Sequence, residues 1–364
     1  MLNACAVLFS GHNERAIVTL CRFFHAHNIP FVIVASSKDD AIFQTHWRAQ
    51  IAMVREGASL TMALMSQVAH VLQSRMKYPV FCPTSEFLNQ FVLANRQAMI
   101  DVGWHCTLPP AELYCLLSNK SSSPACIEQL IGLRMPAEQK YDAWAPPCVL
   151  KPKSNVVKGK VLYPVLCRDS QALAIAREGL DTTQWFAQEW IDGQSIYLCA
   201  YVDQSGGYDS YWQINLLQQP HGKSMVLACT GENPGVDVGL LMRGLHRLGY
   251  RGPFMMEIIR DTNGQLYFIE VNPRFWGPLN LSLNASPALL HRFAVDAGLV
   301  PQMHTMPQSA EGIFWYAWAY GAQVDACRTY PAMPEWLTGS TLTPWLLQHD
   351  VYAQPDTIIL SNSH

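Results

Sequence analysis

The sequence predicts a mixed α/β and α+β protein, in which an open parallel α/β domain precedes an α+β body and an aromatic-rich C-terminal extension. Three observations support this prediction. Short apolar runs alternate with a helical pattern near the N-terminus, two apolar runs joined by a tight turn follow residue 252, and aromatic residues and prolines become dense after residue 305. A chain of 364 residues, 49% of them hydrophobic, is long enough for two or three domains with well-filled cores.

The N-terminal region alternates buried-type strands with helical spacing, which predicts a right-handed parallel strand-helix-strand unit. Ligands of such open sheets bind at the carboxyl ends of the strands, where this chain has Ser10–Asn13 and Thr84–Glu86. Plain turn chemistry explains these two loops as well as a substrate role does. We place this domain at residues 1–112, with strands Ala6–Phe9, Phe31–Ala35 and Pro79–Cys82 and helices Glu14–His27 and Ser59–Gln73.

A compact α+β unit is predicted for residues 113–190, and a largely antiparallel unit for residues 191–304. Prolines and glycines separate the apolar runs in both. The first unit has helices Ser118–Gly132 and Ser170–Glu178, strands Cys148–Lys151, Val161–Leu166 and Trp185–Gln188, and the loop Lys153–Lys160. The second has strands Gln194–Val202 and Tyr211–Leu217, helices Gly235–Leu248 and Pro287–Ala297, and a hairpin between these helices.

This hairpin is the most informative stretch of the chain. Its strands flank the turn Asp261–Gly264, in which Asn-Gly is a strong hairpin signal. The first strand contributes Glu257, and the second contributes Glu270 and Asn272, which share a face because side chains alternate along a strand. Pairing the strands can bring Glu257 alongside. The result would be a cluster of hard oxygen ligands suited to a magnesium ion that also holds phosphate oxygens.

An ordinary hairpin with solvated acids is the simpler interpretation, but the neighbouring residues argue against it. Glu270 lies between Ile269 and Val271, and a buried acid without a partner is energetically expensive. Arg274 follows on the same face, and its guanidinium group suits a phosphate or a carboxylate.

The run Ile269–Arg274, with the sequence Ile-Glu-Val-Asn-Pro-Arg, resembles the metal-binding signature of the ATP-grasp superfamily. The resemblance implies that Glu257, Glu270 and Asn272 hold Mg²⁺, or alternatively Mn²⁺, on the phosphates of ATP. It also implies that Arg274 contacts the transferred phosphoryl group or the acceptor. The similarity extends over roughly residues 1–298, because Val80–Glu86 resembles the pre-ATP-grasp domain of carbamoyl-phosphate-synthase-like members. Residues 113–190 would then form the small lid subdomain, and residues 191–304 the C-terminal subdomain of the ATP-grasp fold.

Lysines are the candidates for phosphate binding, because the chain has neither a GxxxxGK[ST] loop nor a GxGxxG motif after its first strand. Lys151 ends a buried-type strand against a proline, unlike a solvated surface lysine. The resemblance implies that Lys120 and Lys151 are nucleotide-binding lysines and that Lys151 also assists catalysis. The loop Lys153–Val161 matches the mobile phosphate-covering loop in place. It holds a single glycine, Gly159, so Lys158 would supply charge where the family often uses backbone amides.

The segment Gln188–Gly193 resembles the hinge that holds adenine in the family. The resemblance implies that the carbonyl group of Glu189 accepts a hydrogen bond from adenine and that the amide of Ile191 donates one, with Gln188 and Trp190 beside them. Two residues past Gly193 the family commonly has a glutamate for the ribose hydroxyls. This chain has Ser195, so ribose contact would fall to Asp192 or Ser195, or be weak.

Composition restricts the partners and the compartment. The net charge is −3, only 15% of residues are charged and no basic run occurs, which disfavours nucleic acid. The 11 cysteines are scattered without a CxxC pair, which favours a reduced, cytoplasmic protein. No apolar run reaches membrane-spanning length. For residues 305–364 we favour packing on the body, while covering the acceptor site or forming a homodimer stay open.

The function expected from the resemblance is an ATP-dependent carboxylate–amine ligase. ATP would phosphorylate a small-molecule carboxylate to an acyl phosphate, and an amine would displace phosphate to give an amide or peptide bond. Positioning and charge neutralisation carry such phosphoryl transfer. Carboxy- or carbamoyl-phosphate chemistry, an ATP-grasp kinase and a non-catalytic nucleotide-binding protein are the alternatives, since all share the ATP half of the site.

Overall fold

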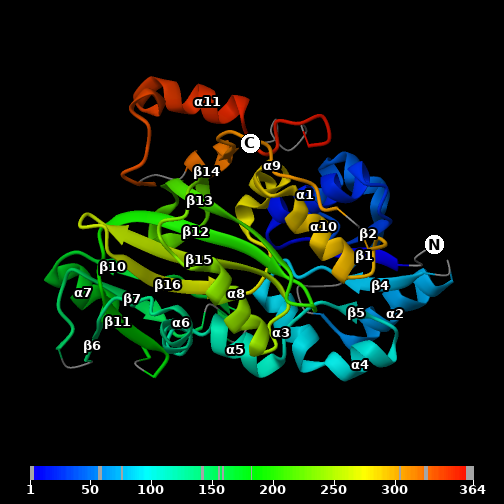
Figure 1. Cartoon of the computed structure of the whole chain (residues 1–364), viewed down its shortest axis with the longest axis horizontal. Coiled ribbons are helices and arrows are strands. Elements are labelled where there is room, and N and C mark those ends of the chain that lie inside the picture. The colour runs from blue at the N-terminus through cyan, green and yellow to red at the C-terminus, as the bar shows by residue number, and fades with distance from the viewer. Residues whose placement is uncertain are drawn as a thin grey trace.

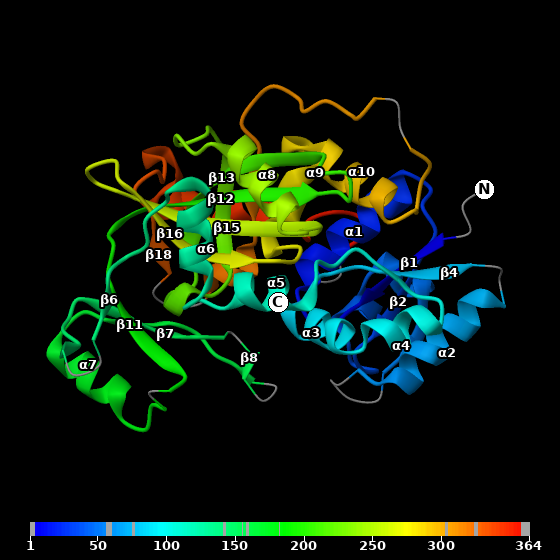
Figure 2. The same cartoon turned by 60° about the horizontal axis from the view of Figure 1, so that its bottom comes forward.

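The structure is a computed structural model, which describes residues 4–55, 60–74, 77–140, 143–154, 156–157, 160–181, 183–302, 305–323 and 327–357. Three larger sheets and a two-stranded ribbon organise the described residues (Figure 1). Figure 2 shows the N-terminal domain and a smaller unit at opposite ends of the molecule, on the same side of a large central sheet. The smaller unit spans residues 138–189 and is called the lid unit. Within the described part of the chain, no helix is long and apolar enough to cross a membrane.

The N-terminal domain is a five-stranded parallel sheet with strand order β3-β2-β1-β4-β5. Every residue of β1 is buried because helices cover both faces. Ala4, Ala6 and Leu8 pack with α1 on one face, and Cys5, Val7 and Phe9 pack with α2 on the other. The elements are β1 (Ala4–Phe9), α1 (Glu14–Ala26), β2 (Phe31–Ala35), β3 (Ile51–Val54), α2 (Met62–Gln73), β4 (Tyr78–Phe81), α3 (Glu86–Ala94), α4 (Arg96–Asp101) and β5 (His105–Cys106). The predicted parallel α/β domain is confirmed.

The lid unit is a four-stranded sheet of order β10-β7-β11-β6, packed against one helix, α7. Its elements are β6 (Glu138–Gln139), β7 (Cys148–Pro152), β10 (Val165–Cys167), α7 (Ser170–Arg177) and β11 (Trp185–Glu189). A separate two-stranded ribbon, β8 (Val156–Val157) and β9 (Lys160–Val161), lies between β7 and β10 in the chain. The predicted strand Val161–Leu166 is therefore wrong, because Leu162–Pro164 interrupts it and a proline cannot donate to a strand ladder.

The predicted helix Ser118–Gly132 is confirmed only in part, because one helix ends at Ser118 and the next begins at Ser123. These are α5 (Ala111–Ser118) and α6 (Ser123–Ile131). Between them the side chain of Asn119 accepts hydrogen bonds from the amide and hydroxyl of Ser121, each at 2.9 Å, a local bond that competes with helix. Both helices pack against the central sheet at β16, so the break presents Lys120 before the lid unit.

The central sheet has strand order β16-β15-β12-β13-β14-β17, with β18 paired to β13. One face packs through Ile196, Leu198 and Ala200 against α8, and the other packs through Cys199 and Tyr201 against α10. The elements are β12 (Gly193–Val202), β13 (Tyr208–Gln218), β14 (Met225–Gly231), α8 (Val238–Arg247), β15 (Gly252–Asp261), β16 (Leu266–Asn272), α9 (Ser282–Ala285) and α10 (Pro287–Asp296). The predicted antiparallel strands and the hairpin are confirmed.

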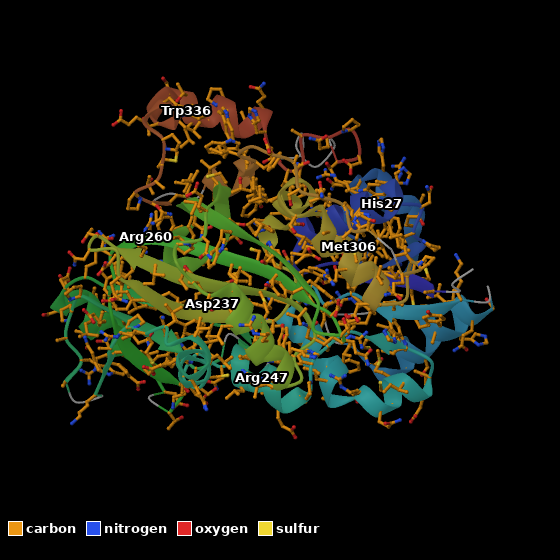
Figure 3. All side chains as sticks on the ribbon, viewed as in Figure 1. His27, Asp237, Arg247, Arg260, Met306 and Trp336 are labelled. Atoms are coloured by element: carbon orange, nitrogen blue, oxygen red, sulfur yellow. The ribbon has the colours of Figure 1, made fainter. Side chains whose placement is uncertain are left out.

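Helix α8 has a favourable residue at each end (Figure 3). Asp237 is its N-cap and accepts a hydrogen bond from the amide of Leu240 at 2.8 Å. Arg247 lies in the last turn, where a cation opposes the helix dipole. Both end residues stabilise α8, which packs on one face of the central sheet.

The C-terminal segment is part of the central sheet. Strand β17 (Trp315–Ala317) pairs with β14, and β18 (Arg328–Thr329) pairs with β13. Helix α11 (Leu342–Gln348) follows, and Trp336 lies at the edge of the molecule (Figure 3). The segment thus packs on the body as we favoured, and homodimer formation stays a prediction.

Asn13 joins the N-terminal domain to the central sheet. It is the N-cap of α1 and adopts a left-handed conformation, with φ 58° and ψ 50°. Its side-chain amide donates to the carbonyl of Thr84 at 3.0 Å and to that of Phe275 at 3.2 Å. The amide of Phe275 in turn donates to the carbonyl of Pro83 at 2.9 Å. These bonds fix the ends of β1 and β4 against the loop that follows β16.

Replacing Asn13 tests this joint. Asn13→Ala and Asn13→Gly both remove the two side-chain bonds, and we expect each to lower the free energy of unfolding by about 1–3 kcal/mol. Alanine also strains the left-handed backbone, so it should be the less stable of the two by about 1 kcal/mol. Urea denaturation measures both values, and an Asn13→Gly protein as stable as wild type would contradict the role of the bonds.

Candidate active site

A cleft of about 1430 Å³ lies between the lid unit, the central sheet and the N-terminal domain. Small-molecule pockets are commonly about 300–1,000 Å³, so this cleft has room for more than one small ligand. The cleft contains most of the residues singled out from the sequence: Lys120, Lys151, Glu189, Trp190, Ile191, Asp192, Glu257, Glu270, Asn272 and Arg274. Lys158 lies outside the described residues. Residues more than a hundred positions apart in the chain therefore meet at one site.

The two carboxylates face each other as the hairpin pattern predicts. Glu257 on β15 pairs directly with Glu270 on β16, and a register shift follows Glu257. The side-chain amide of Asn272 donates to Glu270 Oε1 at 2.7 Å, which confirms that these two side chains share a face. Arg274 continues the row, and its Nη2 donates to Asn272 Oδ1 at 3.3 Å.

Two lysines approach this acidic pair from the lid side. Lys120 Nζ lies 2.6 Å from Glu270 Oε2, and its side chain is 5% exposed. The backbone amide of Lys120 donates to the carbonyl of Lys153 at 3.0 Å, which fastens the break between α5 and α6 to the end of β7. Lys151 is buried in β7. Burial, reinforced by the nearby Lys120 ammonium group, lowers the pKa of Lys151 to about 8 despite the opposing effect of Glu270 and Glu257.

The pKa values of the two glutamates diverge. Burial and the charge of Glu270 raise the pKa of Glu257 to about 7. Burial would also raise the pKa of Glu270, but the Lys120 ammonium group, the hydrogen bond from Asn272 and the charge of Lys151 together outweigh it and lower that pKa to about 2. Strong divergence of neighbouring pKa values is typical of functional sites. The pair has one firmly held negative charge and a second that a further cation would stabilise.

Ser195 supports the acidic pair instead of facing the cleft. Its side chain is fully buried, and it is absent from the residues that line the described cleft. The hydroxyl donates to Glu257 Oε1 at 2.8 Å and accepts a hydrogen bond from Asn215 Nδ2 at 2.7 Å. The Ser195 hydroxyl is thus engaged by Glu257 and Asn215, and the ribose contact expected of Asp192 or Ser195 stays a prediction. A serine is short enough to remain under the strand surface, where a glutamate would extend into the cleft.

Gln188 is likewise a supporting residue. It is 2% exposed, and its side-chain amide donates to the carbonyl of Pro136 at 3.3 Å. Its side chain does not line the cleft, and the place of Gln188 beside the adenine contacts stays a prediction. The next residues do line it: Glu189 is held by its amide to the carbonyl of Ala137 at 2.8 Å, and Trp190 to that of Pro147 at 3.4 Å. Neighbouring carbonyls thus fix the segment that follows Gln188 where it lines the cleft.

The other end of the cleft meets the strand ends of the N-terminal domain. Of the two loops suggested from the sequence, His12, Asn13 and Thr84–Glu86 line it, and Trp276 lines it as well. Glu86 is buried in the first turn of α3 and accepts a hydrogen bond from Gln90 Nε2 at 3.1 Å. A carboxylate and the Arg274 guanidinium group therefore border this end.

Tyr197, Arg328 and Tyr330 are among the cleft residues that were missed in the sequence. Tyr197 pairs with Glu257 across β12 and β15, and burial beside that carboxylate raises its pKa. Its position two residues after Ser195 was a usable signal, because strand alternation places both on one face. Arg328 and Tyr330 also line the cleft. No local pattern predicted them, because the pairing of β18 with β13 joins segments far apart in sequence.

No protein-family model matches the chain, and no curated protein sequence matches it significantly. Solved structures do match it. The biotin carboxylase domain of *Hydrogenobacter thermophilus* 2-oxoglutarate carboxylase, in complex with MgADP, ADP and bicarbonate, gives a TM-score of 0.63 at 13% identity, covering 85% of this chain and 73% of that one.

Two further structures extend the likeness. Biotin carboxylase from *Campylobacter jejuni*, in a β,γ-ATP complex, gives a TM-score of 0.64 at 13% identity over 85% of this chain and 74% of its own. The L-amino acid ligase from *Bacillus licheniformis* gives 0.59 at 15% identity over 83% and 75%. The chain has the ATP-grasp fold that its Ile269–Arg274 motif indicated, and the fold prediction is confirmed.

The acidic pair gives a prediction for the metal-free protein. Because the folded-state pKa of Glu257 is raised from 4.5 to about 7, its ionisation destabilises the fold above about pH 7, and this effect disappears as the pH falls toward 4.5. Glu257→Gln removes the charge. In EDTA we expect the variant to be about 1–3 kcal/mol more stable than wild type at about pH 8, with the difference shrinking toward zero near pH 5. Urea denaturation at both pH values checks this, and a less stable variant at pH 8 would contradict the repulsion.

Proposed function

We propose that this protein is an ATP-dependent, ADP-forming ligase that joins a small-molecule carboxylate to an amine. The observation that carries the proposal is the single cleft in which Glu257, Glu270 and Asn272 face Lys120 and Lys151. The fold supports it, because the similar structures include carboxylases solved with adenine nucleotides and an amino acid ligase. The proposal places the reaction between the hinge and the strand ends of the N-terminal domain.

The donor set fits a magnesium ion held together with a nucleotide. Two carboxylates and an amide oxygen are hard ligands, and Mg²⁺ is commonly bound by one or two carboxylates plus substrate phosphates. In the described residues no three His, Cys, Asp or Glu side chains gather into a complete metal cage. Glu257, Glu270 and Asn272 would therefore hold the ion only with phosphate oxygens, and the ion would neutralise charge on those oxygens.

The nucleotide would lie between the hinge and the two lysines. The backbone of Glu189 and Ile191 suits the adenine edge, since polar main-chain groups at a strand end need no particular side chain. Lys120 and Lys151 would neutralise phosphate oxygens. Lys120 forms an ion pair with Glu270. Binding would thus exchange part of that ion pair for contacts with phosphate.

The proposed reaction has two steps. A carboxylate oxygen attacks the γ-phosphorus of ATP, the bond from this phosphorus to the β,γ-bridging oxygen breaks, and ADP leaves. The amine nitrogen then attacks the acyl carbon, the bond from this carbon to the phosphate oxygen breaks, and the nitrogen loses a proton. The products are an amide, ADP and phosphate. Arg274 and Lys151 are the catalytic residues, because a guanidinium and an ammonium group stabilise charge on the transferred phosphoryl group.

Carboxy-phosphate chemistry is the second candidate, favoured by the similar structure that holds bicarbonate. One assay separates it from the ligase. ADP and phosphate release is measured with Mg-ATP against a matrix of amino acids, amines, small carboxylates and bicarbonate. Release that needs both a carboxylate and an amine, with a condensed product by mass spectrometry, supports the ligase. Release with bicarbonate alone, or ADP without phosphate from a hydroxyl acceptor, contradicts it and indicates carboxy-phosphate chemistry or a kinase.

Glu270→Ala tests the metal-binding role. The variant removes the carboxylate that pairs with Lys120 and Asn272, and we expect Mg²⁺-dependent ADP release to fall at least about a hundredfold. Glu128→Ala, which removes an exposed glutamate on α6 outside the cleft, is the matched control and should keep wild-type turnover. A folded Glu270→Ala protein with wild-type turnover would overturn the assignment.

Lys151→Ala tests the nucleotide side. Loss of a buried ammonium group near the phosphates should weaken ATP binding by about tenfold or more. Calorimetric titration with ATP measures the change. Lys140→Ala, at a lysine of the lid unit that does not line the cleft, should bind ATP as wild type does. Equal affinity in wild type and the Lys151 variant would remove the residue from the site.

A further inference from the structure

Arg328 of the C-terminal segment lies against the hinge. Its guanidinium carbon is 4.3 Å from the centre of the Trp190 ring and 4.5 Å from that of the Tyr330 ring. Its Nη2 lies 3.5 Å from Asp192 Oδ1. Arg328, Trp190, Asp192 and Tyr330 all line the cleft. Arg328 lies outside residues 1–298, the part of the chain that resembles ATP-grasp proteins. It nevertheless lines the end of the cleft where the adenosine is expected.

The sheet holds Arg328 firmly in this position. Gln218 and Arg328 are register partners of β13 and β18, and the amide of Tyr330 donates to the carbonyl of Leu216 at 3.0 Å. Two residues later the amide of Ala332 donates to Gln194 Oε1 at 2.8 Å. A guanidinium group between two aromatic rings is further stabilised by cation–π attraction. Arg328 is thus a fixed part of the cleft wall.

Binding of a ribose beside the hinge requires a side chain that faces the cleft and accepts hydrogen bonds from the ribose hydroxyls. Ser195 is fully buried and bonded to Glu257, so its hydroxyl does not face the cleft. Asp192 does line the cleft, and its side chain is 82% exposed. An exposed aspartate on a hinge samples several rotamers unless a partner restrains it. The Arg328 guanidinium group, 3.5 Å away, biases the position of the carboxylate by its charge and leaves the carboxylate oxygens able to accept further hydrogen bonds.

We propose that Arg328 is a positioning residue for the nucleotide: it holds the hinge and directs the Asp192 carboxylate toward the ribose hydroxyls of a bound adenosine nucleotide. This inference rests on the proposed function, since it assumes that the cleft binds ATP. It assigns a role to the C-terminal segment, whose strand β18 completes one wall of the nucleotide site. The ribose contact thus depends on two residues, 192 and 328, that the sheet brings together.

The test is calorimetric binding of MgADP and of Mg-2′,3′-dideoxy-ADP to the full-length protein. We expect wild type to prefer ADP by about tenfold, the equivalent of one or two hydrogen bonds. Arg328→Ala should weaken ADP binding by about tenfold and reduce the preference to about threefold or less, because Asp192 is no longer directed toward the ribose. Arg328→Lys, which keeps the charge but not the planar group between the rings, should fall between the two.

Arg22→Ala is the matched control. Arg22 also ties the C-terminal segment to the body, through bonds to Asp356 Oδ2 at 2.8 Å and Oδ1 at 3.0 Å, but it does not line the cleft. It should keep the wild-type preference. If Arg22→Ala loses the preference as fully as Arg328→Ala does, Arg328 acts only by docking the segment, and the proposal is overturned.

The remaining outcomes are also decisive. Arg328→Ala and Asp192→Asn proteins that both keep the tenfold preference overturn the proposal, as does a Ser195→Ala protein that alone loses it. Should Arg328→Ala fail to fold by circular dichroism, Asp192→Asn decides, because it alters an exposed side chain. Wild-type protein that binds neither nucleotide contradicts the proposed function itself, which distinguishes that failure from failure of the role of Arg328.

Discussion

The register of β15 against β16 is the constraint on which the site depends. It places Glu257 opposite Glu270 in a partly buried setting, where two negative charges repel each other and burial disfavours both. Much of the surrounding structure offsets this. Lys120 pairs with one carboxylate, the Ser195 hydroxyl donates to the other, and Lys151 is buried close by. A charge cluster of this kind is a weak source of stability, and its two facing carboxylates accord with the proposed binding of a divalent metal ion.

The remaining units of the fold present groups to that cluster. Lys120 lies in the break between α5 and α6, and Lys151 lies near the end of β7. The hinge after β11 also lines the cleft. Asn13 fixes the N-terminal domain so that its strand ends border the far end of the cleft. A nucleotide at the hinge and an acceptor near the strand ends would then meet beside the acidic pair. This arrangement brings reactants together by positioning, which is how phosphoryl transfer is mainly catalysed.

Local patterns in the sequence were enough to predict the parts of the site that lie on one hairpin or at one strand end. The turn Asp261–Gly264 and strand alternation gave the pairing of Glu257 with Glu270 and the shared face of Asn272, and the apolar run before Lys151 gave its burial. Contacts between distant segments were not accessible. The burial of Ser195 depends on Asn215 in the neighbouring strand, and the position of Arg328 depends on pairing across more than a hundred residues. Such pairings follow from the packing of the whole sheet and leave no periodic signal.

The central claim is that the paired glutamates bind a divalent metal together with a nucleotide. Electron paramagnetic resonance of Mn²⁺, titrated with protein in the presence and absence of ADP, tests it most directly, because protein-bound Mn²⁺ loses the sharp signal of the free ion. With ADP present, we expect added protein to lower the free Mn²⁺ signal further than ADP alone does. Without ADP, we expect added protein to leave the signal unchanged. The metal-binding role would be contradicted if protein leaves the signal unchanged at saturating ADP. It would also be contradicted if a Glu257→Gln, Glu270→Ala double variant binds Mn²⁺ as strongly as wild type.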